Sequence, residues 1–421
     1  MIDLSPAGVA PDGAGPEEMA FHAWVAGEHA RHREAATLAC LRRCAQALGS
    51  QASLMKAGLA RVEQEMPGGP EATVSALLGL SAMAFDAAQV ERFRLLLAAS
   101  FRLMQEAGLL STPLAPPEVM GRLCASALRL RIEPQAVRGA ILAQGIGPAT
   151  EADGQIWPWP LRLQTLGRLR VVAAEEPLSD ELPVADKARE LLQRLVAAGA
   201  PGESTASLAS SLWPEQSGSE QDRLLGEAVH RLSQWLRDAS AVEAHGEGLR
   251  LNPRHCWCDA WTFERLTQGL VDDEPGGAAP MDWEAANVAL SLYAGHFLAD
   301  EGDKPWAKAY RNRLRERFLR LVRHVARQFE AMNALGAAAS ICERGLEVDA
   351  TAEPLYQQLM ICHLSRGHHA KALEVYRRCR VSLLGEMGVP PSEQTEQLHR
   401  AAMMPPRSQG LLRPTSGPGA P

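Results

Sequence analysis

The stretch VRHVARQFEAMNALGAAASIC, residues 322–342, is matched 34 positions further on by YQQLMICHLSRGHHAKALEVY, residues 356–376. Each predicts a helix, a short turn and a second helix, and 34 residues is the period of the tetratricopeptide repeat. In that repeat small residues let paired helices pack closely, and Ala338 and Ala372 keep this pattern. Because two hairpins rarely bury a sufficient core, we expect packed neighbours.

The composition favours a helical protein without a strong overall charge. The chain has 421 residues, 46% of them hydrophobic and 5% aromatic, which predicts about two to four domains rich in helix. The net charge of −7 provides no general attraction to nucleic acid or to an anionic membrane, so such binding needs a local patch. Because no signal peptide or membrane span is evident and the cysteines are scattered, we expect a cytoplasmic protein with no membrane contact.

The N-terminal part has apolar residues at helical spacing between residues 18 and 145. Examples are the segments 36–48, 73–85 and 90–104. Breaks containing proline fall at 67–70 and 111–113. We predict about four to seven helices in antiparallel hairpins, which would form a repeat-like layer.

The middle of the chain has the element order of a winged helix. Partly alternating apolar residues at 161–172 predict short strands. Helical patterns follow at 185–199, 204–213 and 219–240, and AVEAHGEGLRLN, residues 241–252, predicts a hairpin with Gly246 and Gly248 at its turn. Ser204 or Thr205 is the expected N-cap of the second helix. From 263 to 399 the pattern is entirely helical.

Several phrases resemble the SARP family of bacterial transcriptional regulators, in which a winged helix precedes a bacterial transcriptional activator domain. They are TLGRLRVV (165–172), SLWPE (211–215), AVHRL (228–232), CDAWTFERL (258–266) and ALEVYRRCRVSLLGEMGVPPSEQT (372–395). Residues 116–145 resemble the junction of larger regulators that carry a signal-transduction ATPase upstream. Since this chain lacks a Gly-x4-Gly-Lys-Ser/Thr loop, the resemblance implies a member without that ATPase.

We therefore predict a mainly α fold with three folded parts. These are an N-terminal helical-repeat layer, a central winged helix (α+β, with small sheets and a wing) and a C-terminal tetratricopeptide-like domain. The predicted boundaries are 1–17 (disordered), 18–145 (helical repeat-like), 146–160 (linker), 161–265 (winged helix), 266–402 (bacterial transcriptional activator domain) and 403–421 (disordered tail).

The candidate DNA-reading surface lies on the third helix and the wing. In a winged helix the third helix enters the major groove, and the hairpin touches the neighbouring backbone. An apolar stripe from Leu225 to Leu236 should face the core and leave a polar face outside. Arginine can pair bidentately with guanine and glutamine with adenine, while wing residues would meet phosphates. The candidates are Arg223, His230, Arg231, Gln234 and Arg237 on the helix, and His245 and Arg250 on the wing.

The local charge argues against this surface. Residues 160–265 contain 12 Lys/Arg and 16 Asp/Glu, a balance of −4, whereas DNA-binding domains usually carry the opposite sign. Ser233 and Gln234 also stand where the SARP family tends to carry arginines. Two functions therefore stay open. One is a transcriptional regulator that binds duplex DNA, and the other is an interaction scaffold whose acidic winged helix no longer reads DNA.

A second basic feature lies between Lys304 and Gln328, where nine Lys/Arg face a single acid, Glu316. Arg313, Arg317 and Arg320 align on one helix and are candidate auxiliary phosphate contacts. The alternative is that these arginines pair with acids of neighbouring helices and cover the repeat surface.

No catalytic, metal or cofactor site is predicted. His22, His29 and His32, with Cys40 and Cys44 nearby, lack the tight spacing and matching second half of a closed zinc site. Cys256 and Cys258 would lie on one side of a strand as small buried hydrophobes. Because no nucleophile or acid/base motif is present, we expect no enzyme activity.

The expected partners follow from the domain order. They are duplex DNA at the winged helix, RNA polymerase or a second copy of the chain at the C-terminal domain, and a signalling protein or peptide on the N-terminal layer. Trp157 and Trp159, beside prolines in the linker, are expected to anchor it onto that layer.

Overall fold

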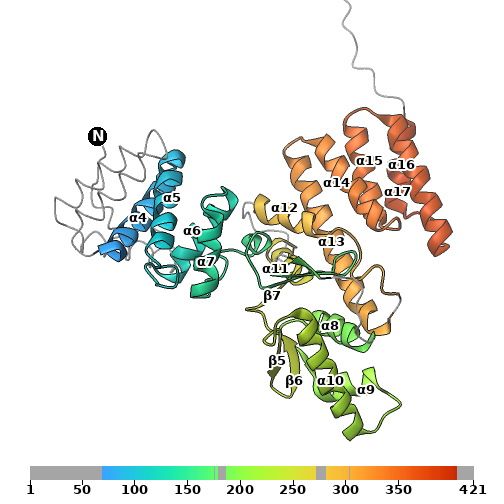
Figure 1. Cartoon of the computed structure of the whole chain (residues 1–421). Helices are drawn as coiled ribbons and strands as arrows, with labels where there is room; N and C mark the ends of the chain where they lie inside the picture. Colours follow the sequence, from blue (N-terminus) through green and yellow to red (C-terminus); the bar gives the residue numbers. More distant parts are fainter. Residues whose placement is uncertain (1–68, 175, 179–185, 272–280, 303, 405–421) are drawn as a thin grey trace, which may run out of the picture. The chain divides into compact units, whose positions relative to one another are not determined.

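The computed structural model describes residues 69–174, 176–178, 186–271, 281–302 and 304–404 (Figure 1). The predictions made for 1–17, for the histidines and cysteines between His22 and Cys44, for the helix at 36–48 and for the tail from 405 lie outside the described residues. The chain divides into two compact units. The first contains the chain up to Leu161 with 173–176 and 252–257, and the second contains 162–172, 177–251 and 258 onward.

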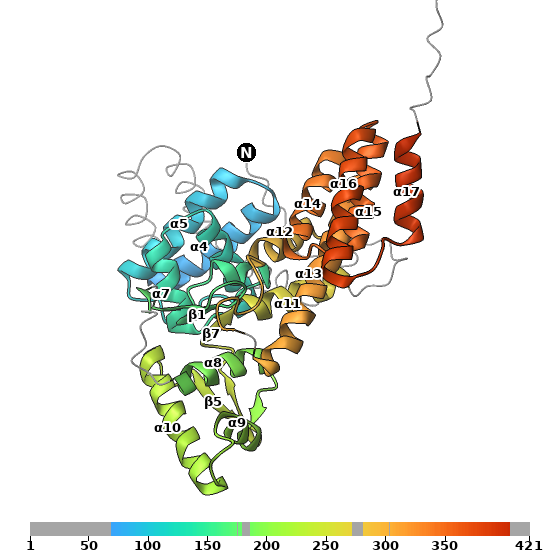
Figure 2. The same cartoon turned by 90° about the vertical axis from the view of Figure 1, so that its right-hand side faces the viewer.

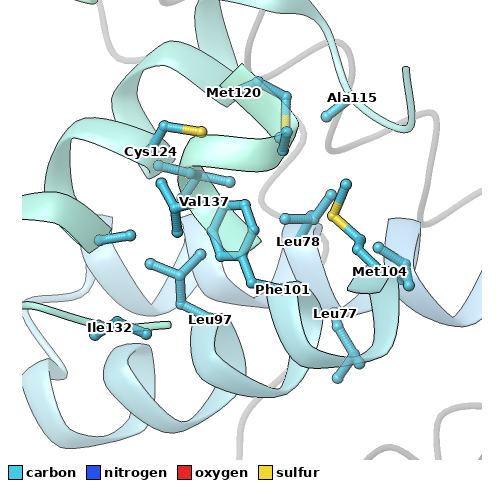
Figure 3. Close-up of a cluster of buried hydrophobic side chains, with 14 of the residues drawn as sticks. Leu77, Leu78, Leu97, Phe101, Met104, Ala115, Met120, Cys124, Ile132 and Val137 are labelled. Atoms are coloured by element: carbon cyan, nitrogen blue, oxygen red, sulfur yellow. The ribbon is translucent and has the colours of Figure 1, made fainter. Parts of the chain in front are cut away.

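Four helices form the described part of the first unit. They are α4 (Gly69–Asp86), α5 (Val90–Glu106), α6 (Pro117–Arg129) and α7 (Pro134–Gln144). Both α6 and α7 begin with proline, whose fixed φ suits a first turn, and α7 is capped at its C-terminus by Gly145 with φ 63°. Figure 3 shows their shared core, where Leu78, Phe101 and Met120 are fully buried. The helices predicted at 73–85 and 90–104 are confirmed.

The linker is attached to this layer by its two tryptophans. Trp157 is 2% exposed and belongs to the same core, and its Nε1 donates to the carbonyl oxygen of Ile146 at 3.1 Å. Trp159 packs against the core edge and donates to the carbonyl oxygen of Gly154 at 3.0 Å, within the short helix η1 (Ala152–Gln155). The prediction that both anchor the linker is confirmed.

The central part has two small sheets and three helices. One sheet has the order β3-β2-β1-β7 and the other the order β4-β6-β5. The strands are β1 (Leu161–Gln164), β2 (Arg170–Ala173), β3 (Glu176–Pro177), β4 (Glu203–Ser204), β5 (Val242–His245), β6 (Gly248–Leu251) and β7 (Cys256–Cys258). The helices are α8 (Asp186–Ala198), α9 (Thr205–Leu212) and α10 (Gly218–Leu236). Helix α10 packs against α8 and α9 (Figure 2).

Local chemistry explains where these elements begin and turn. The Ser204 hydroxyl accepts from the backbone N–H of Ser207 at 3.2 Å and so caps α9. The β5–β6 hairpin pairs His245 with Gly248, and Gly246 takes the positive φ of 59° that the turn requires. The predicted N-cap and hairpin are both confirmed.

Helix α10 ends earlier than predicted. It stops at Leu236, whereas the apolar spacing predicted a helix to residue 240. Arg237 adopts a left-handed conformation with φ 55°, and its N–H bonds to the carbonyl oxygen of Gln234. The N–H of Asp238 bonds to the carbonyl oxygen of Ser233, which completes a Schellman motif. Arg237 therefore caps the helix instead of continuing its exposed face.

A buried carboxylate joins the first sheet to the helices that follow. Asp259 is 4% exposed and begins α11 (Asp259–Val271). It accepts from the backbone N–H and hydroxyl of Thr165 at 2.8 and 2.7 Å and from the N–H of Leu166 and Ala260 at 2.9 and 2.7 Å. Thr165 and Leu166 directly follow β1 and Ala260 belongs to α11, so Asp259 fixes where the C-terminal helices start.

The C-terminal part is a stack of antiparallel helices. After α11 come α12 (Trp283–Leu292), α13 (Pro305–Ala331), α14 (Leu335–Val348), α15 (Glu353–Ser365), α16 (His369–Ser382), the π-helical turn η2 (Leu383–Met387) and α17 (Glu393–Met403). Each helix from α13 to α17 packs on the next (Figure 1). Ala338 and Ala372 are completely buried. The mainly α fold and the tetratricopeptide-like hairpins are confirmed, while the domain boundaries stay a prediction.

The close approach within this stack predicts the effect of adding one methyl group. Replacing Gly345 with alanine would place a Cβ against Leu355 and 3.0 Å from Val322. We expect the crowding to outweigh the better helix propensity of alanine, so that the free energy of unfolding falls by about 1–2 kcal/mol. Gly336→Ala on the same helix is the control, because its nearest atom would be 3.9 Å away. Equal chemical denaturation curves for the two variants would contradict the prediction.

Candidate nucleic-acid interface

The third helix presents the polar face that the sequence predicts. Leu225, Ala228, Leu232 and Leu236 are buried, and Val229 is half-buried. On the opposite side Arg223, His230, Arg231 and Gln234 are exposed. The structure therefore brings these four candidates onto one surface of α10. Arg237 is exposed too, but it lies beyond the helix in the left-handed cap.

Arg223 is held by two acids of its own helix. Its Nε donates to Glu220 Oε2 at 3.0 Å and its Nη2 to Glu220 Oε1 at 2.5 Å, and its Nη1 pairs with Glu227. The hydrogen bond and charge of Glu220 raise the pKa of Arg223 further, and the same hydrogen bond lowers the pKa of Glu220. Both groups are in solvent, so this pairing orients the guanidinium more than it stabilises the fold.

His230 and Gln234 form a second pair one turn further along. Gln234 Nε2 lies 3.0 Å from His230 Nε2, and since an amide NH₂ only donates, the ring nitrogen is the acceptor. Arg231 is exposed beside them and forms no ion pair with any described residue. This face of α10 therefore presents Arg223, which is paired with two acids, and Arg231, which is exposed and not in an ion pair with any described residue.

The wing candidates differ from each other. His245 is exposed at the end of β5, next to the turn. Arg250 lies opposite Glu243 in the hairpin, pairs with it at 2.7 Å, and donates to the carbonyl oxygen of Ala200 at 3.3 Å. Arg250 thus holds the wing in shape, and a phosphate would have to compete with Glu243 for it.

The basic run on α13 is largely engaged with its surroundings. Arg313 pairs with Glu264 at 3.0 Å and lies over the ring of Tyr310, 4.8 Å from its centre. Arg311 donates to the carbonyl oxygen of Phe297 at 3.0 Å, and Arg315 lies 3.7 Å from Asp349. Arg317 and Arg320 also have partners within the chain. These contacts agree with the alternative in which the arginines of α13 pair with neighbouring groups and cover the repeat surface. An auxiliary role in phosphate binding stays a prediction.

The structure also locates the two cysteines considered in the sequence analysis. Cys256 and Cys258 are both buried in β7, as predicted, and burial raises the pKa of the Cys258 thiol. Among the described residues, no group of three or more His, Cys, Asp or Glu side chains is arranged to hold a metal ion. Within the same residues, none of the helices is both long and apolar enough to cross a membrane.

The ion pairs of Arg223 and Arg250 with neighbouring acids were not among the predictions from the sequence. Glu220 and Glu227 stand three residues before and four after Arg223, the spacings at which helical side chains meet. That signal was available from the sequence. The Glu243–Arg250 pair depends on the hairpin register, which places the two residues directly across from each other.

Comparison with known proteins identifies one domain. Residues 258–402 match the family described as the bacterial transcriptional activator domain, which confirms for this part of the chain the resemblance stated from the sequence. No curated protein matches the chain. A solved structure of Mycobacterium tuberculosis EmbR in complex with a low-affinity phosphopeptide is similar, with 22% identity and a TM-score of 0.46. The similarity covers 58% of this chain and 65% of the length of that one.

Proposed function

We propose that the protein regulates transcription by binding duplex DNA through α10 and the β5–β6 wing, since residues 258–402 match the bacterial transcriptional activator domain. The observation that carries the proposal is the exposed face of α10, which presents Arg223, His230, Arg231 and Gln234 away from the buried stripe. These side chains are of the types that read base edges in the major groove. The protein acts as a binding module and not as an enzyme.

The helical parts would supply the remaining contacts. The activator domain would bind RNA polymerase, a second copy of the chain, or both, since stacked helical repeats provide extended binding surfaces. Two copies on adjacent half-sites would bind more tightly than one because the second contact becomes intramolecular. The described helices α4–α7 would serve as the surface for a signalling protein or peptide.

The test is selection of bound fragments from randomised duplex DNA. We expect the wild-type protein to enrich a motif, and Arg231→Ala to weaken binding to it by about 5- to 150-fold. Arg377→Ala is the matched control, because Arg377 is also exposed but lies on α16. A folded wild-type protein that retains all sequences equally, and none at higher salt, would refute the proposal.

The alternative function is an interaction scaffold. Its support is the acid clamp on Arg223 and the Glu243 contact of Arg250, since both reduce the positive charge that a DNA backbone requires. This alternative would be favoured if the wild-type protein retained no DNA and instead captured a protein partner through the exposed face of α10.

A further inference from the structure

The pairing of Arg223 leaves part of its guanidinium available in a defined orientation. Three of its N–H groups contact acids: Nε and one on Nη2 contact Glu220, and one on Nη1 contacts Glu227. A guanidinium has five N–H groups. The remaining two, one on each terminal nitrogen, have no partner among the described residues. Two adjacent donors are what the O6 and N7 acceptors of guanine require.

Glu220 and Glu227 lie in different parts of α10, so the presence of each has a different physical reason. Glu220 lies in the first turn of α10, where a carboxylate is stabilised by the positive end of the helix dipole. Glu227 lies in the middle of the helix, where the dipole gives no such benefit. Because an exposed ion pair adds little stability, the fold does not require an acid at Glu227. A carboxylate on the DNA-reading face also weakens attraction to phosphates, so its presence needs another reason.

Building on the DNA-binding function proposed above, we propose that Arg223 and Glu227 read DNA as a pair. Arg223 donates to a guanine, and Glu227 orients it while accepting a hydrogen bond from the N4 amino group of a cytosine in a neighbouring base pair. Because Arg223 Nη1 donates to Glu227, the polar ends of the two side chains lie within hydrogen-bond distance of each other. That separation is comparable to the spacing of stacked bases, about 3.4 Å, so the pair can reach adjacent base pairs.

The chemistry of the carboxylate gives discrimination as well as contact. An ionised carboxylate only accepts hydrogen bonds, and cytosine presents a donor in the major groove. Guanine presents only acceptors there, and thymine an acceptor and a methyl group, so Glu227 disfavours both. In this arrangement the acidic winged helix exchanges non-specific affinity for sequence preference.

The experiment compares wild type, Glu227→Gln and the control Asp222→Asn in the same selection from randomised duplex DNA. Glutamine has the shape of glutamate without its charge and pairs with adenine. We expect the wild-type motif to contain a cytosine. In the motif selected by Glu227→Gln, that position should change to adenine or lose its preference, and the affinity of the variant for the wild-type site should fall by about 5- to 150-fold. Asp222→Asn should keep the motif, because it removes the same charge from the same helix at an exposed residue that forms no ion pair or hydrogen bond with Arg223.

Each outcome decides the matter. If Glu227→Gln selects the same motif as wild type, the proposal that Arg223 and Glu227 read DNA as a pair is overturned, while the proposed function stands. The same change of motif in both variants would also overturn it, because charge alone would then be responsible. If wild type enriches no motif, the proposed function fails and this inference fails with it. Glu227 and Asp222 are both on the protein surface, so melting curves equal to wild type confirm that folding is unaffected.

Discussion

Replacing Asp259 with alanine is expected to lower the free energy of unfolding of the second unit by about 3–6 kcal/mol, because it removes the acceptor for three buried backbone N–H groups at about 1–3 kcal/mol each. The donors are Thr165, Leu166 and Ala260, all within 2.9 Å of the carboxylate. None has water at hand to replace it, since Asp259 is 4% exposed and Thr165 is fully buried. Hydrogen exchange of peptides from 162–172 and 258–271, followed with rising denaturant, measures the change.

Asp282→Ala is the matched control for this prediction. Asp282 also begins a helix and accepts from a backbone N–H, that of Ala285 at 2.9 Å, but it is exposed. Its removal should cost only about 1 kcal/mol, as is usual for an N-cap in water. Similar losses in the two variants would mean that Asp259 is no more than a helix cap. A much larger loss at Asp259 would establish it as the connection between the segment that follows β1 and α11.

Features set by short-range chemistry were predictable from the sequence. Ala338 and Ala372 marked the hairpins because a 34-residue period requires small residues at close contacts. Ser204 marked the start of α9, and Gly246 marked the turn of the wing, because few residues satisfy those positions. Four candidates on α10 lie together because helical periodicity places them on one face.

Features set by tertiary structure or by an unusual residue were not predictable. The end of α10 was misplaced because Arg237 takes a left-handed conformation that glycine or asparagine usually marks. The hydrogen bonds of Asp259 reach donors 93 and 94 residues earlier in the chain, so no local pattern indicates them. The roles of Arg250 and Arg313 depend on Glu243 and Glu264, which only the hairpin register and helix packing bring near.

Trp157→Ala is expected to lower the free energy of unfolding of the first unit by about 3–5 kcal/mol, the usual cost of deleting a fully buried large aromatic side chain. The indole fills the core shared by α4–α7 and donates to the carbonyl oxygen of Ile146. Trp157→Phe keeps most of the packing and should lose about 1–2 kcal/mol for the missing hydrogen bond and smaller ring. Denaturant-dependent hydrogen exchange of peptides from 90–144 reports these changes.

Trp159→Ala is the control for Trp157→Ala. It also removes an aromatic ring from the linker, but not a fully buried one. Trp159 is half-buried and contacts only the edge of the core, so its loss should cost clearly less. If Trp157 is the stronger of the two anchors, limited proteolysis will cut the segment 146–160 faster in Trp157→Ala than in Trp159→Ala, because the first variant loses the larger share of the contact that protects the backbone. Equal cutting in both would mean that the segment is held by its own hydrogen bonds, such as those that Asp153 accepts from Thr150 and Arg129.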